Sequence, residues 1–425
     1  MQLATWTTTP RTPPVTAGTA PARGRTGTAP ASRRPFGTAA VVIALCLWSS
    51  ASPSVLYPVY AADWGLSSTV TTSVFAAYPA ALVLMLLLAG GISDRIGRRA
   101  AMLAGTVAMA LAAAVFLVAG GVAMLVAGRV LQGVGTGLAL GAAGAALVEN
   151  DVSGRPSRVS STTTCASAGG LALSTVVGGA LVQYAPMPRH LLFVVLLVLA
   201  AGVAVLVAQL PRPVRDPAAR TGSLVSAVRV PAGLRTGYVV AAVPVATAFA
   251  VGALFLALGA QMARELVGTS NVLVTGAALA VLPVSLAATA LTLRGLTPHR
   301  SIVAGGVLSA VGLAALELTD ARGSLALFFG TGVVAGAGYA LGFGGGLRLV
   351  NGLAPAHHRG QLLSAMYLAA YLLQGVVAVG AGLTATSHGL DAALHLTVPV
   401  LAALALAGSV LAVADAHRRR RPAEA

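Results

Sequence analysis

Residues 90–99 read Gly-Gly-Ile-Ser-Asp-Arg-Ile-Gly-Arg-Arg and separate two apolar runs, residues 68–90 and 100–119. Each run is close to the roughly 20 residues that an α-helix needs to cross the hydrocarbon core of a bilayer. The ten residues between them hold three arginines and one aspartate, which favour water. This stretch therefore predicts a short polar loop between two membrane-spanning helices.

The same alternation of apolar runs and short basic connections continues along the chain. Of the 425 residues, 57% are hydrophobic and 9% are charged, against roughly 25% charged in soluble proteins. The mean hydropathy of +0.86 excludes a soluble globular protein. Twelve runs of spanning length predict an all-α membrane protein with twelve transmembrane helices. These runs are residues 37–62, 68–90, 100–119, 121–148, 159–184, 190–210, 236–261, 271–293, 301–319, 323–349, 361–386 and 389–414.

The distribution of arginine predicts the orientation of these helices. All 27 basic residues are arginine, and with 11 acidic residues they give a formal charge of +16. A nucleic-acid-binding protein would gather such charge on a polar domain, so the short connections exclude nucleic acid as the partner. The termini and alternate connections hold 23 arginines, and the other connections hold Arg189, Arg264 and Arg322. The positive-inside rule therefore predicts cytoplasmic termini, and the Ala-rich, lysine-free composition favours a bacterial cytoplasmic membrane.

Composition also divides the chain into segments. Residues 1–36 lack hydrophobic periodicity and predict a disordered cytoplasmic tail. Residues 211–235, rich in proline and arginine, predict a central cytoplasmic loop. This loop separates two predicted six-helix bundles, residues 37–210 and 236–414, and residues 415–425 form a basic cytoplasmic tail.

The two predicted bundles have matching spacing. An offset of about 203 residues places Gly133 and Gly135 on Gly336 and Gly338, and superposes the helices and loops of one half on those of the other. Such agreement predicts an internal duplication and two pseudo-symmetric bundles with a site between them.

The loop at residues 90–99 resembles the signature of the major facilitator superfamily, Gly-x-x-x-Asp-Arg-x-Gly-Arg-Arg, at every defined position. The resemblance implies the twelve-helix, two-bundle fold of that superfamily. It also implies a conformational latch in which Asp94 meets the start of the eleventh helix near Gln361. An ordinary positive-inside loop would explain the arginines but not the aspartate and spaced glycines. The latch residues are Gly90, Asp94, Arg95, Gly97, Arg98 and Arg99.

The fourth run contains Arg129-x-x-Gln132-Gly133-x-Gly135, which resembles a second signature found in proton-coupled members of the superfamily. An arginine inside a span costs at least about 2.5 kcal/mol on insertion scales, so we expect it to face a partner or a watery cavity. Snorkelling to the outer surface is the alternative. If transport is coupled to protons, we expect Arg129 and Gln132 to act with Asp63. The position of Asp63 after the first run favours a solvated charge at a helix end as the alternative.

The fifth run carries Gly170, Gly178 and Gly179, and is similar to the antiporter signature Gly-x-x-x-Gly-Pro-x-x-Gly-Gly. Ser174 and Thr175 stand where the signature has Gly-Pro. Together with Gly133 and Gly135, the three glycines form the predicted helix-packing motif. The first two signatures favour export, and the altered third favours uptake.

Aromatic and polar residues on the facing helices are candidates for a substrate cavity. An apolar cavity with a few polar groups suits amphipathic or aromatic compounds better than sugars. For Tyr57, an interfacial aromatic belt is the alternative. The candidate cavity residues are Trp48, Tyr57, Tyr78, Tyr339, Tyr367, Tyr371 and Gln374.

The resemblance implies a monomeric transporter in the bilayer that exports small amphipathic compounds, such as antibiotics, drugs or metabolites, with protons as coupling ion. No phosphate-binding loop, metal-ligand spacing or nucleophile elbow occurs, so we expect no catalytic residue, metal site or other cofactor. Proton-coupled uptake of a nutrient or metabolite is the alternative within transport. A non-transporting membrane sensor or scaffold would need a soluble output domain, and a membrane-embedded enzyme would need clustered intramembrane His, Asp or Glu.

Overall fold

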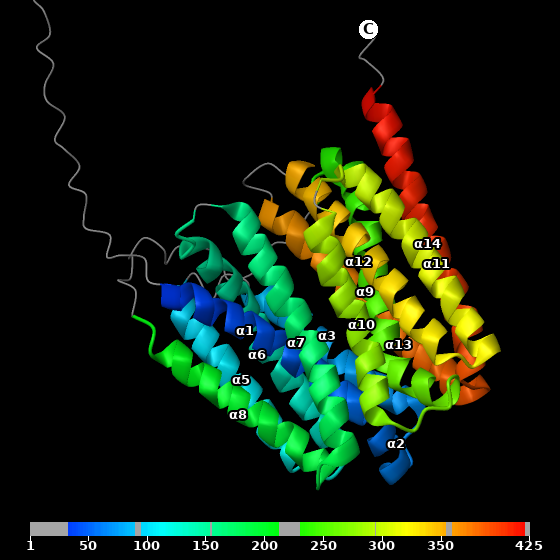
Figure 1. The fold of residues 1–425 in the computed structure, drawn as a ribbon. Coiled ribbons are helices and arrows are strands. Elements are labelled where there is room, and N and C mark those ends of the chain that lie inside the picture. The colour runs from blue at the N-terminus through cyan, green and yellow to red at the C-terminus, as the bar shows by residue number, and fades with distance from the viewer. Residues whose placement is uncertain are drawn as a thin grey trace, which may run out of the picture.

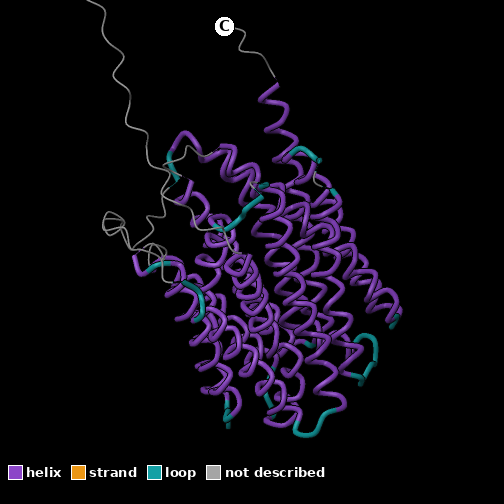
Figure 2. The backbone as a smooth tube through the Cα atoms, turned by 60° about the vertical axis from the view of Figure 1, so that its left-hand side comes forward, coloured by secondary structure: helices purple, strands orange, loops and turns teal. Residues whose placement is uncertain are grey.

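The computed structural model describes residues 33–89, 95–153, 155–211, 230–293, 295–353 and 359–420. Helices make up nearly all of these ranges, which contain no strand (Figures 1 and 2). The elements are α1 (Arg33–Ala51), η1 (Ser52–Leu56), α2 (Tyr57–Trp64), α3 (Ser68–Ala89), α5 (Arg98–Leu117), α6 (Val122–Glu149), α7 (Pro156–Tyr184), α8 (Pro188–Ala208), η3 (Ala232–Leu234), α9 (Arg235–Glu265), α10 (Val272–Thr292), α11 (Pro298–Arg322), α12 (Leu325–Leu353), α13 (Arg359–His388) and α14 (Leu390–Arg420).

Twelve spans in the described part of the chain are long and apolar enough to cross a membrane. They coincide with the twelve apolar runs of the sequence, which confirms the predicted fold class. A helix pairs the backbone N–H and C=O groups of its own segment, and such pairing is required where no water is present. We call the end of the bundle that holds Arg33 and Arg420 the terminal end, and the opposite end the distal end.

The first span is interrupted, although the sequence predicted one helix over residues 37–62. Helix α1 ends at Ala51, five residues of 3₁₀-helix follow, and α2 completes the span. Pro53 and Pro58 explain the break, because each lacks the N–H that would bond to the carbonyl four residues earlier.

Two helices extend beyond the predicted boundaries. Helix α1 begins at Arg33, so residues 33–36 of the expected disordered tail are helical. Helix α14 continues to Arg420, past the expected end at residue 414, and projects beyond its neighbours (Figure 1). Asp415 anchors this extension by accepting from His299 Nε2 at 2.8 Å and Arg419 Nε at 2.7 Å. The remaining tail residues lie outside the described ranges.

Glycine packing in the two halves supports the predicted duplication. A Cβ at Gly133 of α6 would lie 2.5 Å from the Tyr78 carbonyl oxygen of α3, and one at Gly135 would lie 2.7 Å from the Gly105 carbonyl oxygen of α5. Gly336 and Gly338 of α12 contact α10 and α11 in the same way. The fourth span of each half therefore lies against the second and third spans, and glycine permits both close approaches.

The two halves meet along two helix pairs, α7 with α10 and α3 with α13. In Figure 1 the first half, coloured blue to green, lies beside the second half, coloured yellow-green to red. Because the apolar core includes residues from both halves, the interface between them is continuous with the interior of each half. This interface contains the candidate site.

Candidate functional site

Arg129 of α6 is completely buried, with 0% of its surface exposed. Its Nη1 donates to the Ser50 carbonyl oxygen at 2.8 Å and to Gln132 Oε1 at 3.0 Å, and its Nη2 donates to the Phe75 carbonyl oxygen at 3.4 Å. The guanidinium carbon also lies 5.0 Å from the centre of the Tyr78 ring. Snorkelling to the membrane surface is therefore wrong for this residue.

Two prolines explain why carbonyl oxygens are available to this pair of side chains. Pro79 in α3 lacks the N–H that would bond to the Phe75 carbonyl oxygen, and Pro53 lacks the one that would bond to the Ser49 carbonyl oxygen. Gln132 Nε2 donates to the Ser49 carbonyl oxygen at 2.9 Å. Arg129 and Gln132 thus supply the donors that the prolines remove, and they hold α6 against α1 and α3.

Asp63 does not accompany Arg129, contrary to our expectation of a pair. It lies 13 residues beyond Ser50 along the first span, or about 20 Å along a helix axis. Its carboxylate pairs with Arg189 Nη1 at the distal end, at 3.0 Å. Both side chains of this pair are more than 40% exposed, as expected for a solvated charge at a helix end.

A pocket of about 160 Å³ lies between the two halves. Helices α1, α3 and α7 line it from the first half, and α9, α10, α12 and α13 line it from the second. We call it the central pocket. Its lining residues are Leu47, Ser50, Phe75, Tyr78, Leu171, Thr175, Phe249, Gly252, Phe255, Leu256, Leu279, Leu282, Pro283, Leu286, Tyr339, Tyr371 and Gln374.

An aromatic cluster forms the wall of the central pocket on the side of the second half. Phe249 of α9 lies at its centre, with ring centroids 4.9 Å from Tyr371, 6.1 Å from Tyr339 and 6.2 Å from Tyr367. Its contact with Tyr371 is edge-on, a favoured aromatic arrangement. Three tyrosines from α12 and α13 are thereby gathered around one phenylalanine.

Four of the seven expected cavity residues, Tyr78, Tyr339, Tyr371 and Gln374, line the central pocket. Tyr367 contacts Phe249 but is not part of the lining.

Trp48 and Tyr57 do not line the central pocket, contrary to our expectation. Leu47 and Ser50 line the central pocket. Trp48 is turned about 100° from Leu47 and about 160° from Ser50 on the same helix, and it packs against the apolar core. Tyr57 follows the helix break and lines a cavity at the distal end instead.

Ser174 shows what replaces the expected Gly-Pro of the fifth span. Its Oγ donates to the Trp48 carbonyl oxygen at 2.8 Å and lies 3.0 Å from Ser52 Oγ. This hydroxyl therefore contributes another contact to the interrupted region of the first span. Gly170 packs against the Ala44 backbone of α1, and Gly178 against Val55.

Hydrogen bonds join the halves at the distal end, in what we call the distal seam. Thr69 N donates to Thr386 Oγ1 at 2.8 Å between α3 and α13. Val272 N donates to Gln183 Oε1 at 2.8 Å between α10 and α7. A Cβ at Gly179 would lie only 2.6 Å from the Val272 carbonyl oxygen. The halves are thus in close contact at this end.

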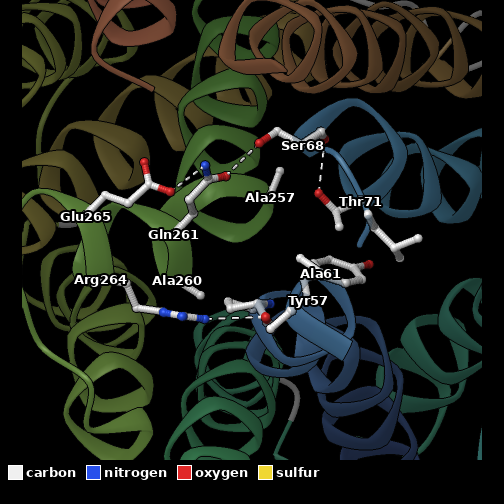
Figure 3. A pocket seen from close by; sticks show the side chains of 12 residues that line it. Tyr57, Ala61, Ser68, Thr71, Ala257, Ala260, Gln261, Arg264 and Glu265 are labelled. Carbon is white, nitrogen blue, oxygen red and sulfur yellow. Dashed lines mark hydrogen bonds between the residues drawn. The ribbon is translucent and has the colours of Figure 1, made fainter. Parts of the chain in front are cut away.

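A cavity of about 410 Å³ lies within the distal seam. Figure 3 shows Gln261 between Glu265 and Ser68, with hydrogen bonds of 2.8 and 3.1 Å. Arg264 reaches the Pro58 carbonyl oxygen at 3.4 Å. Gln261 and Arg264 therefore tie α9 to α3 and α2, respectively.

Arg98 and Arg99 of the expected latch bind residues of the first half at the terminal end. Arg98 Nε pairs with Glu149 Oε1 at 3.1 Å, and Arg99 Nη2 donates to the Ala208 carbonyl oxygen at 2.6 Å. Gly97 has φ of +92°, which favours glycine, and it directly precedes α5. Arg95 is exposed, whereas Gly90 and Asp94 lie outside the described residues.

Sequence reasoning missed the helix break and the residues that depend on it. Pro53 was a readable signal, because proline inside an apolar run predicts a freed carbonyl. Phe249 and Phe75 carried no such signal, since a phenylalanine in a span is equally suited to lipid contact.

Comparison with known proteins agrees with this architecture. A profile described as "Major Facilitator Superfamily" matches residues 38–263, more than half of the chain. No match to a curated protein was found.

Several solved structures share the fold at low sequence identity. The peptide transporter POT in complex with sulfate superposes with a TM-score of 0.73 at 16% identity, covering 93% of this chain and 96% of that one. The D-xylose-proton symporter gives 0.72 at 16% identity, with 89% and 96% covered. A single-residue mutant of the nucleoside transporter NupG gives 0.69 at 12% identity, with 90% and 99% covered.

These findings confirm the twelve-helix transporter fold, and they leave the exporter branch a prediction. They indicate a multi-pass membrane transporter rather than an enzyme. The chain belongs to the Major Facilitator Superfamily.

Proposed function

We propose that this protein is a secondary active transporter that exports a small amphipathic compound in exchange for protons. The central pocket carries this proposal, because both halves line it while the distal seam closes one end of the interface. Alternating access requires such a site at the junction of two halves that can move against each other. With cytoplasmic termini, this conformation would be closed toward the outside.

The lining of the central pocket suggests the size and character of the compound. Its volume of about 160 Å³ lies below the roughly 300–1,000 Å³ typical of pockets for drug-sized ligands. In this conformation it therefore suits a compact molecule. Aromatic rings and a few polar groups favour an aromatic or amphipathic compound over a polyhydroxylated one.

Proteoliposomes that enclose a pH-sensitive dye test the proposal. Candidate compounds are added under an imposed proton gradient, and compound-dependent proton movement is expected for the native protein. Arg129→Ala is expected to abolish this movement, while Arg322→Ala serves as a control because it removes an exposed arginine at the end of α11 that belongs to neither the central pocket nor the expected latch. Compound flux without proton movement would contradict the coupling but not the transport.

Whole cells distinguish export from uptake. An exporter should accumulate less compound than cells without the protein, and an uncoupler should raise the internal concentration. An importer should show the reverse in both measurements. Equal accumulation in all four conditions, with purified protein inactive across the panel, would favour a non-transporting membrane sensor or scaffold.

A further inference from the structure

The charges in and around the central pocket bear on the charge of the substrate that it can bind. None of its lining residues is charged. The seven acidic residues with described side chains all lie near helix ends or in connections, away from this lining. They are Asp63, Glu149, Asp151, Glu265, Glu317, Asp391 and Asp415.

Arg129 places a positive charge behind the pocket wall. Its guanidinium carbon lies 5.5 Å from the centre of the Phe75 ring and 5.0 Å from that of Tyr78, and both rings line the pocket. Ser50, whose carbonyl oxygen binds Arg129, lines it as well. One layer of side chains therefore separates this charge from an occupant.

No acidic group in the described part of the chain neutralises this charge. The described hydrogen-bond acceptors of Arg129 are two backbone carbonyls and an amide oxygen, all uncharged, and its buried Nε has no partner among the described residues. Carbonyl dipoles stabilise a cation, but they leave its net charge in place. A charge buried among apolar groups acts over a longer range than one in water.

We propose that the central pocket binds compact aromatic anions in preference to matched cations, a conclusion that rests on the proposed function of this pocket as the substrate site. The field of Arg129 attracts an anion and repels a cation across the Phe75 and Tyr78 rings. On the opposite wall, the Tyr339 and Tyr371 hydroxyls and the Gln374 amide provide donors for a carboxylate or sulfonate. The aromatic cluster around Phe249 contacts the apolar part of the ligand.

Equilibrium binding to the detergent-purified full chain tests this proposal without depending on transport. Three probes share one ring and differ in charge: benzenesulfonate, methyl phenyl sulfone and phenyltrimethylammonium. By isothermal titration calorimetry, the sulfonate is expected to bind at least about tenfold more tightly than the ammonium compound, with the neutral sulfone between them. Equal affinities, or tighter binding of the ammonium compound, would overturn the proposal.

Variants assign the preference to the charge of Arg129. Gln374→Glu adds a carboxylate to the lining with almost no change in shape, and above the pKa of this residue it should remove most of the preference. Arg129→Lys should retain the preference, and Arg129→Gln should lose it. If Arg129→Gln does not fold, Gln132→Glu decides the matter, because it places a carboxylate beside Arg129 Nη1 and leaves the pocket lining unchanged. An unchanged preference in Gln132→Glu would overturn the assignment.

The binding and transport experiments together distinguish failure of the anion preference from failure of the proposed function. If none of the three probes binds the folded native protein while other compounds still drive proton movement in proteoliposomes, the anion preference falls and the proposed function stands. If the sulfonate binds selectively but no proton movement occurs in proteoliposomes, the proton coupling fails and the charge preference stands.

Discussion

Arg129 and Arg99 both bind backbone carbonyl oxygens, but they do so in different surroundings. Arg129 is completely buried and binds carbonyls of α1 and α3, one of them freed by Pro79. Arg99 is only half-buried and binds the last carbonyls of α8 at the terminal end. Water can replace Arg99 but cannot reach the partners of Arg129. The same arginine–carbonyl hydrogen bonds are therefore expected to contribute much more to stability inside the bundle than at its terminal end.

Replacing Arg129 should produce the largest effect. Arg129→Ala leaves two buried carbonyl oxygens and the Gln132 amide oxygen without their donor, and we expect the free energy of unfolding to fall by about 3 kcal/mol. Titration of the purified protein with SDS measures this change. Arg129→Lys should lose less, because it retains a donor. If Arg129→Ala lowered the free energy of unfolding by less than Arg99→Ala does, burial would not increase the contribution of these contacts.

Gln132→Leu should have the second-largest effect, at about 1–2 kcal/mol, since the Ser49 carbonyl oxygen then lacks a partner. Pro53→Ala restores an N–H four residues after Ser49 and offers this carbonyl a bond within its own helix. In the double variant, Pro53→Ala should therefore offset part of the loss. Strict additivity in a double-mutant cycle would show that Gln132 does not serve the carbonyl that Pro53 leaves free.

Arg99→Ala should cost about 0.5–1 kcal/mol, because water can solvate the carbonyls at the end of α8. The same SDS titration measures this difference on the same scale as for Arg129. A loss as large as that of Arg129→Ala would mean that burial does not decide the contribution of these contacts.

The Arg98–Glu149 ion pair should contribute least. The Glu149 side chain is 53% exposed, and exposed ion pairs are worth roughly 0–1 kcal/mol and weaken with salt. We expect Glu149→Gln to change the free energy of unfolding by less than about 0.5 kcal/mol, and this small change to vanish at high salt. A larger, salt-independent loss would place this pair in the same class as the buried contacts.

Much of the fold was predictable, because the requirement to span a bilayer leaves little choice. Twelve apolar runs predicted twelve spans, and the glycine offset predicted that Gly133 and Gly336 occupy equivalent positions. The break in the first span was missed because the prediction rested on apolar composition and length, which Pro53 and Pro58 hardly change. The pairing of Arg129 with Asp63 was wrong because sequence shows which charges exist, but not which ends of two helices meet.

The sequence by itself determined the number of spans, the polar connections, and the need of a buried arginine for polar partners. These properties follow from composition and length, since apolar segments and charges partition between lipid and water whatever their neighbours. Only the tertiary structure decided that Arg129 binds the Ser50 and Phe75 carbonyls, and that three tyrosines pack around Phe249 in the wall of the central pocket. In a helix that is apolar on every side, no periodicity marks the inward face, so only packing against the other half selects it.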